Sequence, residues 1–309
     1  MTQYDLLVIT GPTASGKTVL AASIAARLNG EIISADSRQV YRGMDIGTGK
    51  DLGDYDVDGV MIPVHLIDIE DPGNKYNVFR YQRDFLDAYN EIRNRKKFPV
   101  VCGGSGLYID SIISGYRLIK VPPDPALRKK LEKKEMPELI EILKSLKKLH
   151  NITDIDSKKR IIRAIEIEKY SGQYPENRTT FPKIGSLIIG VKLDRELRRK
   201  RVTERLIKRL KNGMVEEVQN LIDSGVSREA LIYYGLEYKY ITDYLSGRMS
   251  YEEMYSGLET AIHQFAKRQM TWLRGMERKG VMIHWLDGNL PMEEKVRTIL
   301  NLLNSNSEH

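Results

Sequence analysis

Short apolar runs alternate with longer amphipathic stretches over the first third of the chain. The runs are rich in β-forming residues and predict four strands, at Leu6–Thr10, Glu31–Ala35, Met61–Ile69 and Phe98–Cys102. Apolar residues at four-residue spacing predict helices over Lys17–Asn29 and Val78–Lys97, with Asn77 as the N-cap of the second. Strands that alternate with helices in this way predict a parallel sheet with right-handed crossovers.

The pattern changes after Gly115, where strand-like runs give way to short helical stretches and loops. A breaker cluster at Val121–Pro125 is followed by three predicted helices, which begin at Asp124, at Pro137 and at Asp156 or Ser157. Strand character returns at Ser186–Leu193. The chain is therefore interpreted as an α/β domain, residues 1–117 and 184–309, into which a mainly helical domain, residues 118–183, is inserted.

The C-terminal part of the α/β domain is predicted to be mostly helical. Long helices fill 194–279, and a last strand and a last helix are predicted at Val281–Leu286 and Pro291–Leu303. Seven tyrosines fall between Tyr233 and Tyr255. Such residues can stack on nucleic-acid bases, but helical spacing within the group favours packing.

Composition excludes some classes of protein. The chain has 309 residues, 41% of them hydrophobic and 29% charged, as expected for a globular protein of one large or two smaller domains. Its apolar runs are far shorter than the roughly 20 residues of a membrane span. The N-terminus does not resemble a signal peptide, so a cytoplasmic location without a membrane partner is expected. The single cysteine, Cys102, cannot form an internal disulfide, and its apolar strand favours core packing.

The net charge of +7 is concentrated in two segments. Lys192–Lys211 contains ten basic and three acidic residues, and Lys120–Lys169 contains fourteen basic and nine acidic residues. Concentrated positive charge suits a polyanionic partner, such as RNA, DNA or an acidic membrane surface. Each run taken alone is equally typical of a solvated helix face.

The loop after the first predicted strand carries a phosphate-binding motif. Residues 11–18 read GPTASGKT and match G-x-x-x-x-G-K-[ST], between the strand and the helix that the motif requires. Backbone N–H groups and the helix N-terminus of such a P-loop surround phosphate oxygens. The candidate phosphate-binding residues are Gly11, Pro12, Thr13, Ala14, Ser15, Gly16, Lys17 and Thr18. Lys17 would neutralise phosphate charge, and Thr18 would offer its hydroxyl to Mg²⁺.

The P-loop makes the predicted fold a P-loop NTPase-like parallel sheet flanked by helices, but it does not name a reaction. Asp36 follows the second predicted strand and should lie beside the P-loop, because ligands bind where parallel strands end. A carboxylate there could hold Mg²⁺ through water or act as a general base, or it could simply cap a turn.

The P-loop and five further stretches of the sequence together resemble one known family. The P-loop is followed by SADSRQVYRGMDIGT at Ser34–Thr48, and further stretches read HLID at His65–Asp68, VCGGSGLY at Val101–Tyr108, RIIRAIEI at Arg160–Ile167 and AKRQMTW at Ala266–Trp272. They resemble motifs of the tRNA dimethylallyltransferase (tRNA isopentenyltransferase) family and extend over most of the chain. The paired histidines that precede the L-I-D segment in the family are here Val64 and His65, and the insertion is short around Leu149–Lys159. Two further stretches differ from the family pattern. G-T-x-K-P is here GTGKD at Gly47–Asp51, and G-Y-K-E is here GLEY at Gly235–Tyr238.

The resemblance implies transfer of a dimethylallyl group from dimethylallyl diphosphate to N6 of adenine-37 of tRNA. The P-loop would then hold a diphosphate leaving group, with Mg²⁺, and Asp36 would take the proton from the adenine amine. Lys17 would stabilise the charge that develops on diphosphate. Ser105 stands where the family usually has threonine and keeps the hydroxyl that can bond the diphosphate, so it joins Asp36 and Lys17 as a candidate catalytic residue. Arg160 and Arg163 are candidates for binding the diphosphate, although contact with the tRNA backbone or an ordinary helix face would explain them equally.

The resemblance also implies the contacts with RNA. A base in the anticodon loop must leave its stack to reach the diphosphate. The expected tRNA-binding residues are Asp36, Ser37, Arg38, Gln39, Ser105, Arg128, Arg160, Arg163, Lys267, Arg268 and Gln269, with backbone contacts from Lys192–Lys211. The anticodon stem-loop is the expected partner, and the chain is expected to be a monomer.

Two other functions fit parts of the sequence. A P-loop kinase for a small hydroxylated acceptor would use the same phosphate site, and the basic insertion argues against it. An RNA-binding protein with a relict P-loop is disfavoured because Lys17, Thr18 and Asp36 are all intact.

Overall fold

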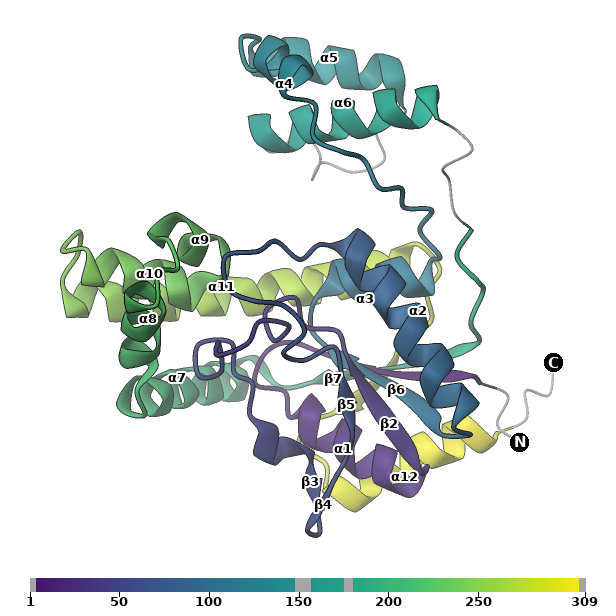
Figure 1. Cartoon of the computed structure of the whole chain (residues 1–309). Coiled ribbons are helices and arrows are strands. Elements are labelled where there is room, and N and C mark those ends of the chain that lie inside the picture. The colour runs from purple at the N-terminus through teal and green to yellow at the C-terminus, as the bar shows by residue number, and fades with distance from the viewer. Residues whose placement is uncertain (1–3, 148–156, 175–179, 306–309) are drawn as a thin grey trace. The chain divides into compact units, whose positions relative to one another are not determined.

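The computed structural model describes residues 4–147, 157–174 and 180–305. The chain divides into two compact units (Figure 1). Met1–Ser114 and Lys183–His309 form one, called here the P-loop unit, and Gly115–Pro182 form the other, called the helical unit. The sequence placed these boundaries after residues 117 and 183.

A six-stranded sheet forms the centre of the P-loop unit. Its strands lie in the order β5-β2-β6-β1-β7-β8, and every neighbouring pair is parallel. They are β1 Leu6–Thr10, β2 Gly30–Ser34, β5 Val64–His65, β6 Phe98–Gly103, β7 Ser186–Lys192 and β8 His284–Asp287. Because β1 lies between β6 and β7, the P-loop that follows it emerges near the middle of the sheet. The predicted α/β class with a parallel sheet is confirmed.

Helices cover both faces of this sheet (Figure 1). On one face lie α1 (Lys17–Arg27) and α12 (Met292–Asn304), and on the other lie α2 (Val78–Asn94) and α3 (Gly106–Ile113). Leu20 and Ile24 of α1 and Ile299 and Leu303 of α12 are buried in one apolar cluster with strand residues. The four-residue spacing of these side chains is what directs one side of each helix toward the sheet.

The strand predicted over Met61–Ile69 is wrong in most of its length. Only β5 joins the sheet, while β4 (Val60–Met61) pairs antiparallel with β3 (Asp56–Val57), after the 3₁₀ turn η1 (Leu52–Tyr55). Pro63 separates β4 from β5 and cannot donate a backbone hydrogen bond. Beyond β5, Leu66 and Asp68 have φ angles of 63° and 53°, which end extended pairing.

Five helices follow β7 and pack at the end of the sheet that carries the P-loop. They are α7 (Arg195–Lys211), α8 (Met214–Asp223), α9 (Arg228–Tyr233), α10 (Leu236–Leu245) and α11 (Tyr251–Arg278). The long helix α11 contacts α3, α7 and α10 and so joins both sides of this region. None of the described helices is long and apolar enough to cross a membrane.

The last strand begins three residues later than predicted, at His284 instead of Val281. The N–H of Val281 donates to the carbonyl of Met276 and completes the end of α11, with Gly280 at a φ of 92°. The apolar run Val281–Ile283 therefore closes a helix before the chain can pair with β7.

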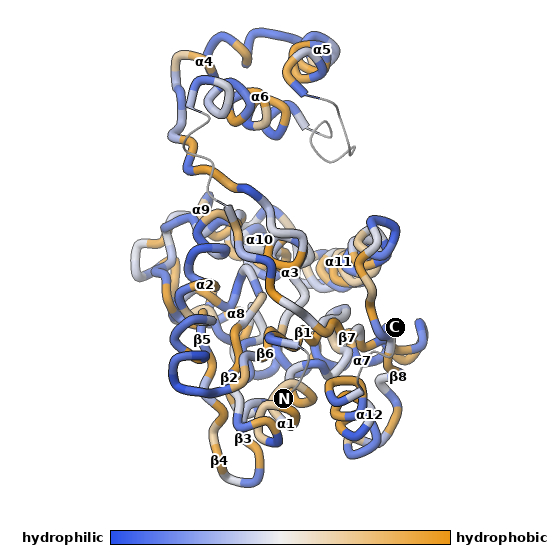
Figure 2. Tube along the Cα trace, turned by 90° about the vertical axis from the view of Figure 1, so that its right-hand side faces the viewer, coloured by the Kyte–Doolittle hydropathy of each residue, from blue (hydrophilic) through white to orange (hydrophobic). Residues whose placement is uncertain are grey.

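The helical unit contains α4 (Pro125–Leu131), α5 (Met136–Leu146) and α6 (Lys158–Gln173). Apolar and polar residues alternate along these helices in Figure 2, and the apolar ones form a separate core. Its most buried members are Leu139, Leu143, Ile161 and Ile165. Asp124 caps α4 by accepting from the N–H of Leu127 at 2.9 Å, as predicted. Ser157 is the N-cap residue of α6, and Asp156 lies outside the described residues.

Glu166 connects three parts of the helical unit. Its side chain is buried, accepts two hydrogen bonds from Arg128 at 2.8–2.9 Å and one from the N–H of Asp124 at 2.6 Å, and pairs with Arg163. Burial alone would raise the pKa of Glu166, but the hydrogen bonds from Arg128, Asp124 and Arg163 outweigh it and lower the pKa to about 2.

We expect Glu166→Gln to destabilise the helical unit by about 2–3 kcal/mol, because a buried group loses charged hydrogen bonds. Since folding lowers this pKa, the stabilisation by Glu166 is complete above about pH 4.5 and is lost as the pH falls toward 2. Hydrogen exchange of α4–α6 amides in the full chain measures both effects, and the variant should lack the pH-dependent part. Glu141→Gln, which removes an exposed carboxylate paired with Lys144, should change exchange little. Equal effects of the two variants would contradict this role of Glu166.

Candidate active site

The P-loop joins β1 to α1 at the end of the sheet where the parallel strands finish. Gly16 is the N-cap residue of α1 and has a φ of 80°, a conformation that glycine adopts without strain. The first turn of α1 therefore directs its backbone N–H groups into the loop. The hydroxyl of Ser15 is buried there and has no hydrogen-bond partner among the described residues. The backbone N–H groups and the Ser15 hydroxyl can donate hydrogen bonds to an anion that enters the loop.

Lys17 places an ammonium group inside this region. Its Nζ donates to the carbonyl of Pro12 at 3.4 Å. Burial lowers the pKa of Lys17, and the neighbouring Cys102 and Asp36 side chains oppose the shift. A cation held away from water beside phosphate-binding amides interacts strongly with any anion that reaches it.

The loop after β2 carries Asp36 and is tied to the loop after β6. One oxygen of Asp36 accepts from the N–H of Arg38 at 2.9 Å. The hydroxyl of Ser105 accepts from the N–H of Ser37 at 2.9 Å and lies 3.2 Å from the Ser37 hydroxyl. Ser105 therefore fixes the residue next to Asp36. Since the N–H of Arg38 occupies one acceptor position of the Asp36 carboxylate, the other positions can serve a ligand.

Two side chains from distant helices hold the P-loop from the other side. Gln269 of α11 accepts from the N–H of Thr13 at 2.8 Å and donates to the carbonyl of Gly104 at 2.9 Å. Arg205 of α7 donates to the hydroxyl of Thr13. The amide of Gln269 thus sets the distance between the P-loop and the loop after β6.

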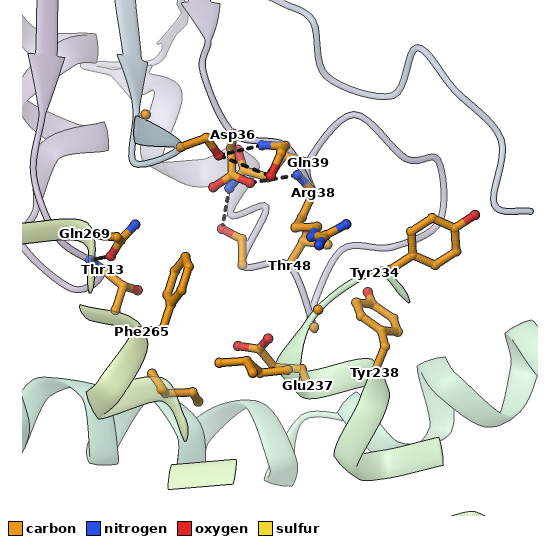
Figure 3. A pocket seen from close by; sticks show the side chains of 18 of the residues that line it. Thr13, Asp36, Arg38, Gln39, Thr48, Tyr234, Glu237, Tyr238, Phe265 and Gln269 are labelled. Carbon is orange, nitrogen blue, oxygen red and sulfur yellow. Dashed lines mark hydrogen bonds between the residues drawn. The ribbon is translucent and has the colours of Figure 1, made fainter. Parts of the chain in front are cut away.

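A cavity of about 460 Å³ lies between these loops and the C-terminal helices. In Figure 3, Asp36, Phe265, Glu237 and Tyr238 surround it from different elements. Its charged lining consists of Lys17, Asp36, Arg38, Arg205, Arg209, Glu237, Lys239 and Arg268. An apolar part is formed by Ile262, Phe265, Leu236 and Tyr233. The cavity can therefore take a ligand with an anionic end and an apolar or aromatic part.

Positive charge dominates beside the P-loop. Burial lowers the pKa of Arg205 to about 10 and also lowers that of Arg209. No carboxylate forms an ion pair with either arginine among the residues that the structure describes. Burial raises the pKa of Glu237, and Arg209 and Arg205 oppose that shift. Lys17 and two guanidinium groups thus face the region of the phosphate loop.

A second cavity, of about 560 Å³, lies on the other side of the same cations. Both cavities are lined by Lys17, Thr18, Gly49, Arg205 and Arg209. The second is also lined by Asp51 and Asp54. Burial and Asp51 raise the pKa of Asp54. Thr18 and the cations are therefore accessible from two directions.

Glu217 of α8 fixes the loop that lines both cavities. Its carboxylate accepts from the backbone N–H groups of Asp45, Ile46 and Gly47 at 2.6–3.0 Å, and from the hydroxyl of Tyr238 at 2.7 Å. One carboxylate thus connects α8, α10 and the loop before Thr48.

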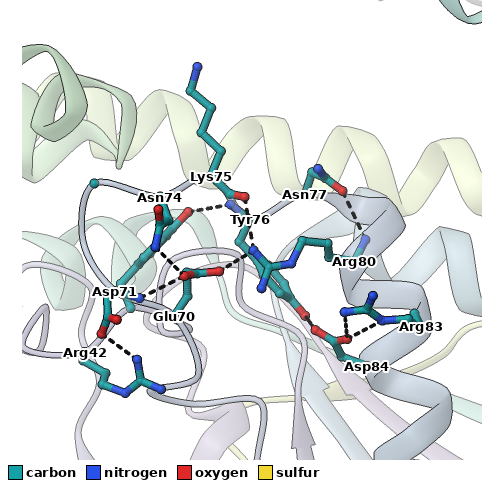
Figure 4. Close-up of polar contacts among 12 residues, drawn as sticks. Arg42, Glu70, Asp71, Asn74, Lys75, Tyr76, Asn77, Arg80, Arg83 and Asp84 are labelled. Carbon is teal, nitrogen blue, oxygen red and sulfur yellow. Dashed lines mark hydrogen bonds and ion pairs between the residues drawn. The ribbon is translucent and has the colours of Figure 1, made fainter. Parts of the chain in front are cut away.

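The part of the cavity that Tyr234 lines is supported by a polar network (Figure 4). Glu70 pairs with Arg80 and accepts from the Asn74 side chain at 2.8 Å, which shapes the 70–77 loop. That loop binds the hydroxyl of Tyr234, which donates to the carbonyl of Asn74 at 2.8 Å and accepts from the N–H of Gly73 at 2.5 Å. Tyr234 is therefore packed in place while it lines the cavity.

The chain is similar to proteins of one enzyme family over most of its length. The model of a family described as IPP transferase matches residues 39–276. A tRNA dimethylallyltransferase 2 from Bacteroides fragilis is 62% identical over 299 residues, which cover 97% of this chain and 98% of that protein. A protein of the same name from Phocaeicola vulgatus is 60% identical over 305 residues, 99% of each chain.

The chain belongs to the IPP transferase family. A solved member, the tRNA isopentenylpyrophosphate transferase from Bacillus halodurans, matches with a TM-score of 0.72 at 32% identity, over 97% of this chain and 95% of that one. A eukaryotic dimethylallyltransferase acting on tRNA shares the fold, with a TM-score of 0.78 at 20% identity over 98% and 81% of the two chains. The predicted family is confirmed, and so is the class of enzyme, a prenyltransferase.

The cavity of this IPP transferase brings together most of the residues that the sequence singled out. Its lining includes Thr13, Lys17, Thr18, Asp36, Ser37, Arg38, Gln39, Ser105, Arg268 and Gln269. Ala14, Ser15 and Gly16 line the second cavity. Gly11 and Pro12 lie in the same loop. The roles given to these residues stay predictions.

The other predicted site residues lie elsewhere. Lys267 lines a separate basic groove, of about 430 Å³, with Arg195, Arg198 and Arg199. Arg128 and Arg163 belong to the helical unit and are engaged there by Glu166. Arg160 lies on the same helix as Arg163, and the predicted contacts of all three arginines with diphosphate or tRNA stay predictions.

Sequence reasoning missed Arg205, Arg209, Glu217 and Glu237 as residues of the site. The two arginines lie inside a basic run for which the sequence alone predicts only tRNA contact or a solvated helix face. Their four-residue spacing, next to the buried Val202 and Leu206, was a usable signal that they share the inner side of α7.

Proposed function

We propose that this IPP transferase moves a dimethylallyl group from dimethylallyl diphosphate to N6 of adenine-37 in tRNA and releases diphosphate. The observation that carries the proposal is one cavity in which P-loop Lys17 and Arg205 lie together with Asp36. The names of the relatives from Bacteroides fragilis and Phocaeicola vulgatus, tRNA dimethylallyltransferase, support it.

The proposed reaction breaks a carbon–oxygen bond and forms a carbon–nitrogen bond. As the bond between the allylic carbon and diphosphate breaks, negative charge grows on the leaving diphosphate. Lys17, Arg205 and the P-loop N–H groups stabilise charge at that place. The adenine amine attacks the allylic carbon, and Asp36 accepts the proton that N6 releases.

Ser105 acts in this proposal through the position of Asp36. Its hydroxyl binds the backbone and side chain of Ser37, so it orients the loop that carries the carboxylate. Gln269 has a similar role for Thr13 and the P-loop. A direct bond from Ser105 to diphosphate would require its hydroxyl to turn away from Ser37.

The residues around the P-loop suit Mg²⁺. Thr18 offers a hydroxyl oxygen that lines both cavities, and oxygen ligands, including those of a bound diphosphate, are what Mg²⁺ prefers. Bound there, the ion would neutralise part of the charge on the leaving diphosphate. Asp54 would add a further carboxylate on the side of the second cavity.

The acceptor side of the cavity suits a base that has left its stack. Arg38 lies over the ring of Tyr233, with its Cζ 5.3 Å from the ring centroid, and Arg268 lies 5.9 Å from the centroid of Phe265. Exposed aromatic rings flanked by guanidinium groups can stack on a base and bind the adjoining phosphates. We assign Arg128, Arg160, Arg163 and Lys267 to the grip on the anticodon stem-loop.

The direct test is transfer of label from radiolabelled dimethylallyl diphosphate to unmodified tRNA in the presence of Mg²⁺. We expect label in tRNA whose position 37 is adenine and none when that base is replaced. ATP with a small hydroxylated acceptor is the comparison reaction. Transfer from ATP without labelling of any tRNA would contradict the proposal and favour a kinase.

A further inference from the structure

Arg209 is a half-buried arginine that the proposed reaction does not yet use. It lies on α7 one turn after Arg205, and it lines both cavities with Lys17 and Thr18. Among the described residues it has no ion pair, and the largest effect on its pKa is a lowering by burial. A half-buried guanidinium that lines two cavities and has no carboxylate partner among the described residues is available to an anion that comes from outside.

The loop beside it is shaped to admit this side chain. Gly49 has a φ of 69°, and a Cβ added there would collide with the guanidinium of Arg209. Glu217 holds the same loop by accepting from three backbone N–H groups, at Asp45, Ile46 and Gly47. The guanidinium therefore rests directly on a fixed segment of backbone.

Glu237 is an acidic neighbour of Arg209 in the main cavity. It lines the main cavity, and among charged groups Arg209 has the largest effect on it. Arg209 of α7 therefore supplies positive charge to a carboxylate of α10.

We propose that Arg209, seated on Gly49 and opposed by Glu237, is a second guanidinium that binds the diphosphate group beside the P-loop. This inference rests on the proposed function for the identity of the anion. With Arg205 it would place two planar donor groups on one anion, an arrangement that suits phosphate oxygens. Glu237 offsets part of the positive charge while the cavity holds no anion.

Binding of inorganic diphosphate, measured by calorimetry on the full chain with Mg²⁺, tests this assignment without tRNA. We expect Arg209→Met to weaken binding about 10- to 100-fold and Arg209→Lys to weaken it less, because lysine keeps the charge but loses the fork of donors. Glu237→Gln should tighten binding several-fold. Lys211→Met, which removes an exposed cation from the same helix, is the matched control and should have no effect.

A double-mutant cycle separates binding from general disturbance of the fold. Gly49→Ala should weaken diphosphate binding in the natural chain, because the added methyl displaces the guanidinium, and should have little further effect in Arg209→Met. Additive losses would overturn the assignment, as would Arg209→Met with unchanged affinity. If the natural chain binds no diphosphate, the proposed function fails as well. If the natural chain binds diphosphate and the Arg209 variants bind it equally well, this inference alone is refuted.

Discussion

Asp36→Asn is expected to slow transfer to tRNA by about 100- to 10,000-fold, the range that a positioned general base contributes. Asparagine keeps the shape of the side chain and the oxygen that accepts from the N–H of Arg38. It cannot take a proton from N6 of adenine. Single-turnover transfer with saturating tRNA and dimethylallyl diphosphate measures the loss directly, without a contribution from product release.

Binding measurements distinguish a lost base from a lost loop. The affinity of Asp36→Asn for tRNA and for inorganic diphosphate should stay close to that of the natural chain. Asp58→Asn, at the exposed turn between β3 and β4, is the matched control and should keep full activity. An Asp36→Asn variant that transfers at the natural rate would remove Asp36 from the role of base.

Lys17→Met is expected to lower kcat by about 100- to 1,000-fold, because a buried cation acts on charge that grows as diphosphate leaves. The same change should leave the midpoint of thermal unfolding unchanged or raise it, since burial of the ammonium group is itself unfavourable. Lost activity together with retained stability cannot be explained by a damaged fold. Steady-state rates and thermal unfolding of the same preparation measure the two quantities.

The division of the lost activity between kcat and KM shows whether Lys17 acts in the ground state or in the transition state. A fall in kcat and in kcat/KM by similar factors indicates an interaction made in the transition state. A rise in KM alone would show that Lys17 binds diphosphate equally in the ground state, contrary to the proposed role. Lys96→Met, which removes an exposed cation just after α2, is the control for loss of one positive charge and should leave kcat and KM unchanged.

The parts of the fold that depend on local pattern could be predicted from sequence. Strand β1 was predicted with the observed bounds, and the P-loop motif predicted the neighbouring site because its chemistry lies within eight consecutive residues. The strand predicted over Met61–Ile69 failed because periodicity cannot show where backbone angles turn positive, as at Leu66 and Asp68.

The remainder of the site depends on packing between distant segments. Arg205 meets Thr13, and Gln269 bridges Thr13 and Gly104, across separations that no local pattern encodes. The tyrosines after residue 233 were interpreted as packing or as base-stacking groups, with packing favoured. Tyr234 is packed and also lines the cavity, while stacking of these tyrosines on a base stays a prediction.

All described residues that line the main cavity belong to the P-loop unit, while the helical unit is inserted in one connection, between α3 and β7. The residues proposed to bind diphosphate thus lie in segments that the insertion interrupts but does not supply. Under the proposed function, changes in the length or sequence of the insertion would alter its contacts with tRNA and leave the diphosphate site in place.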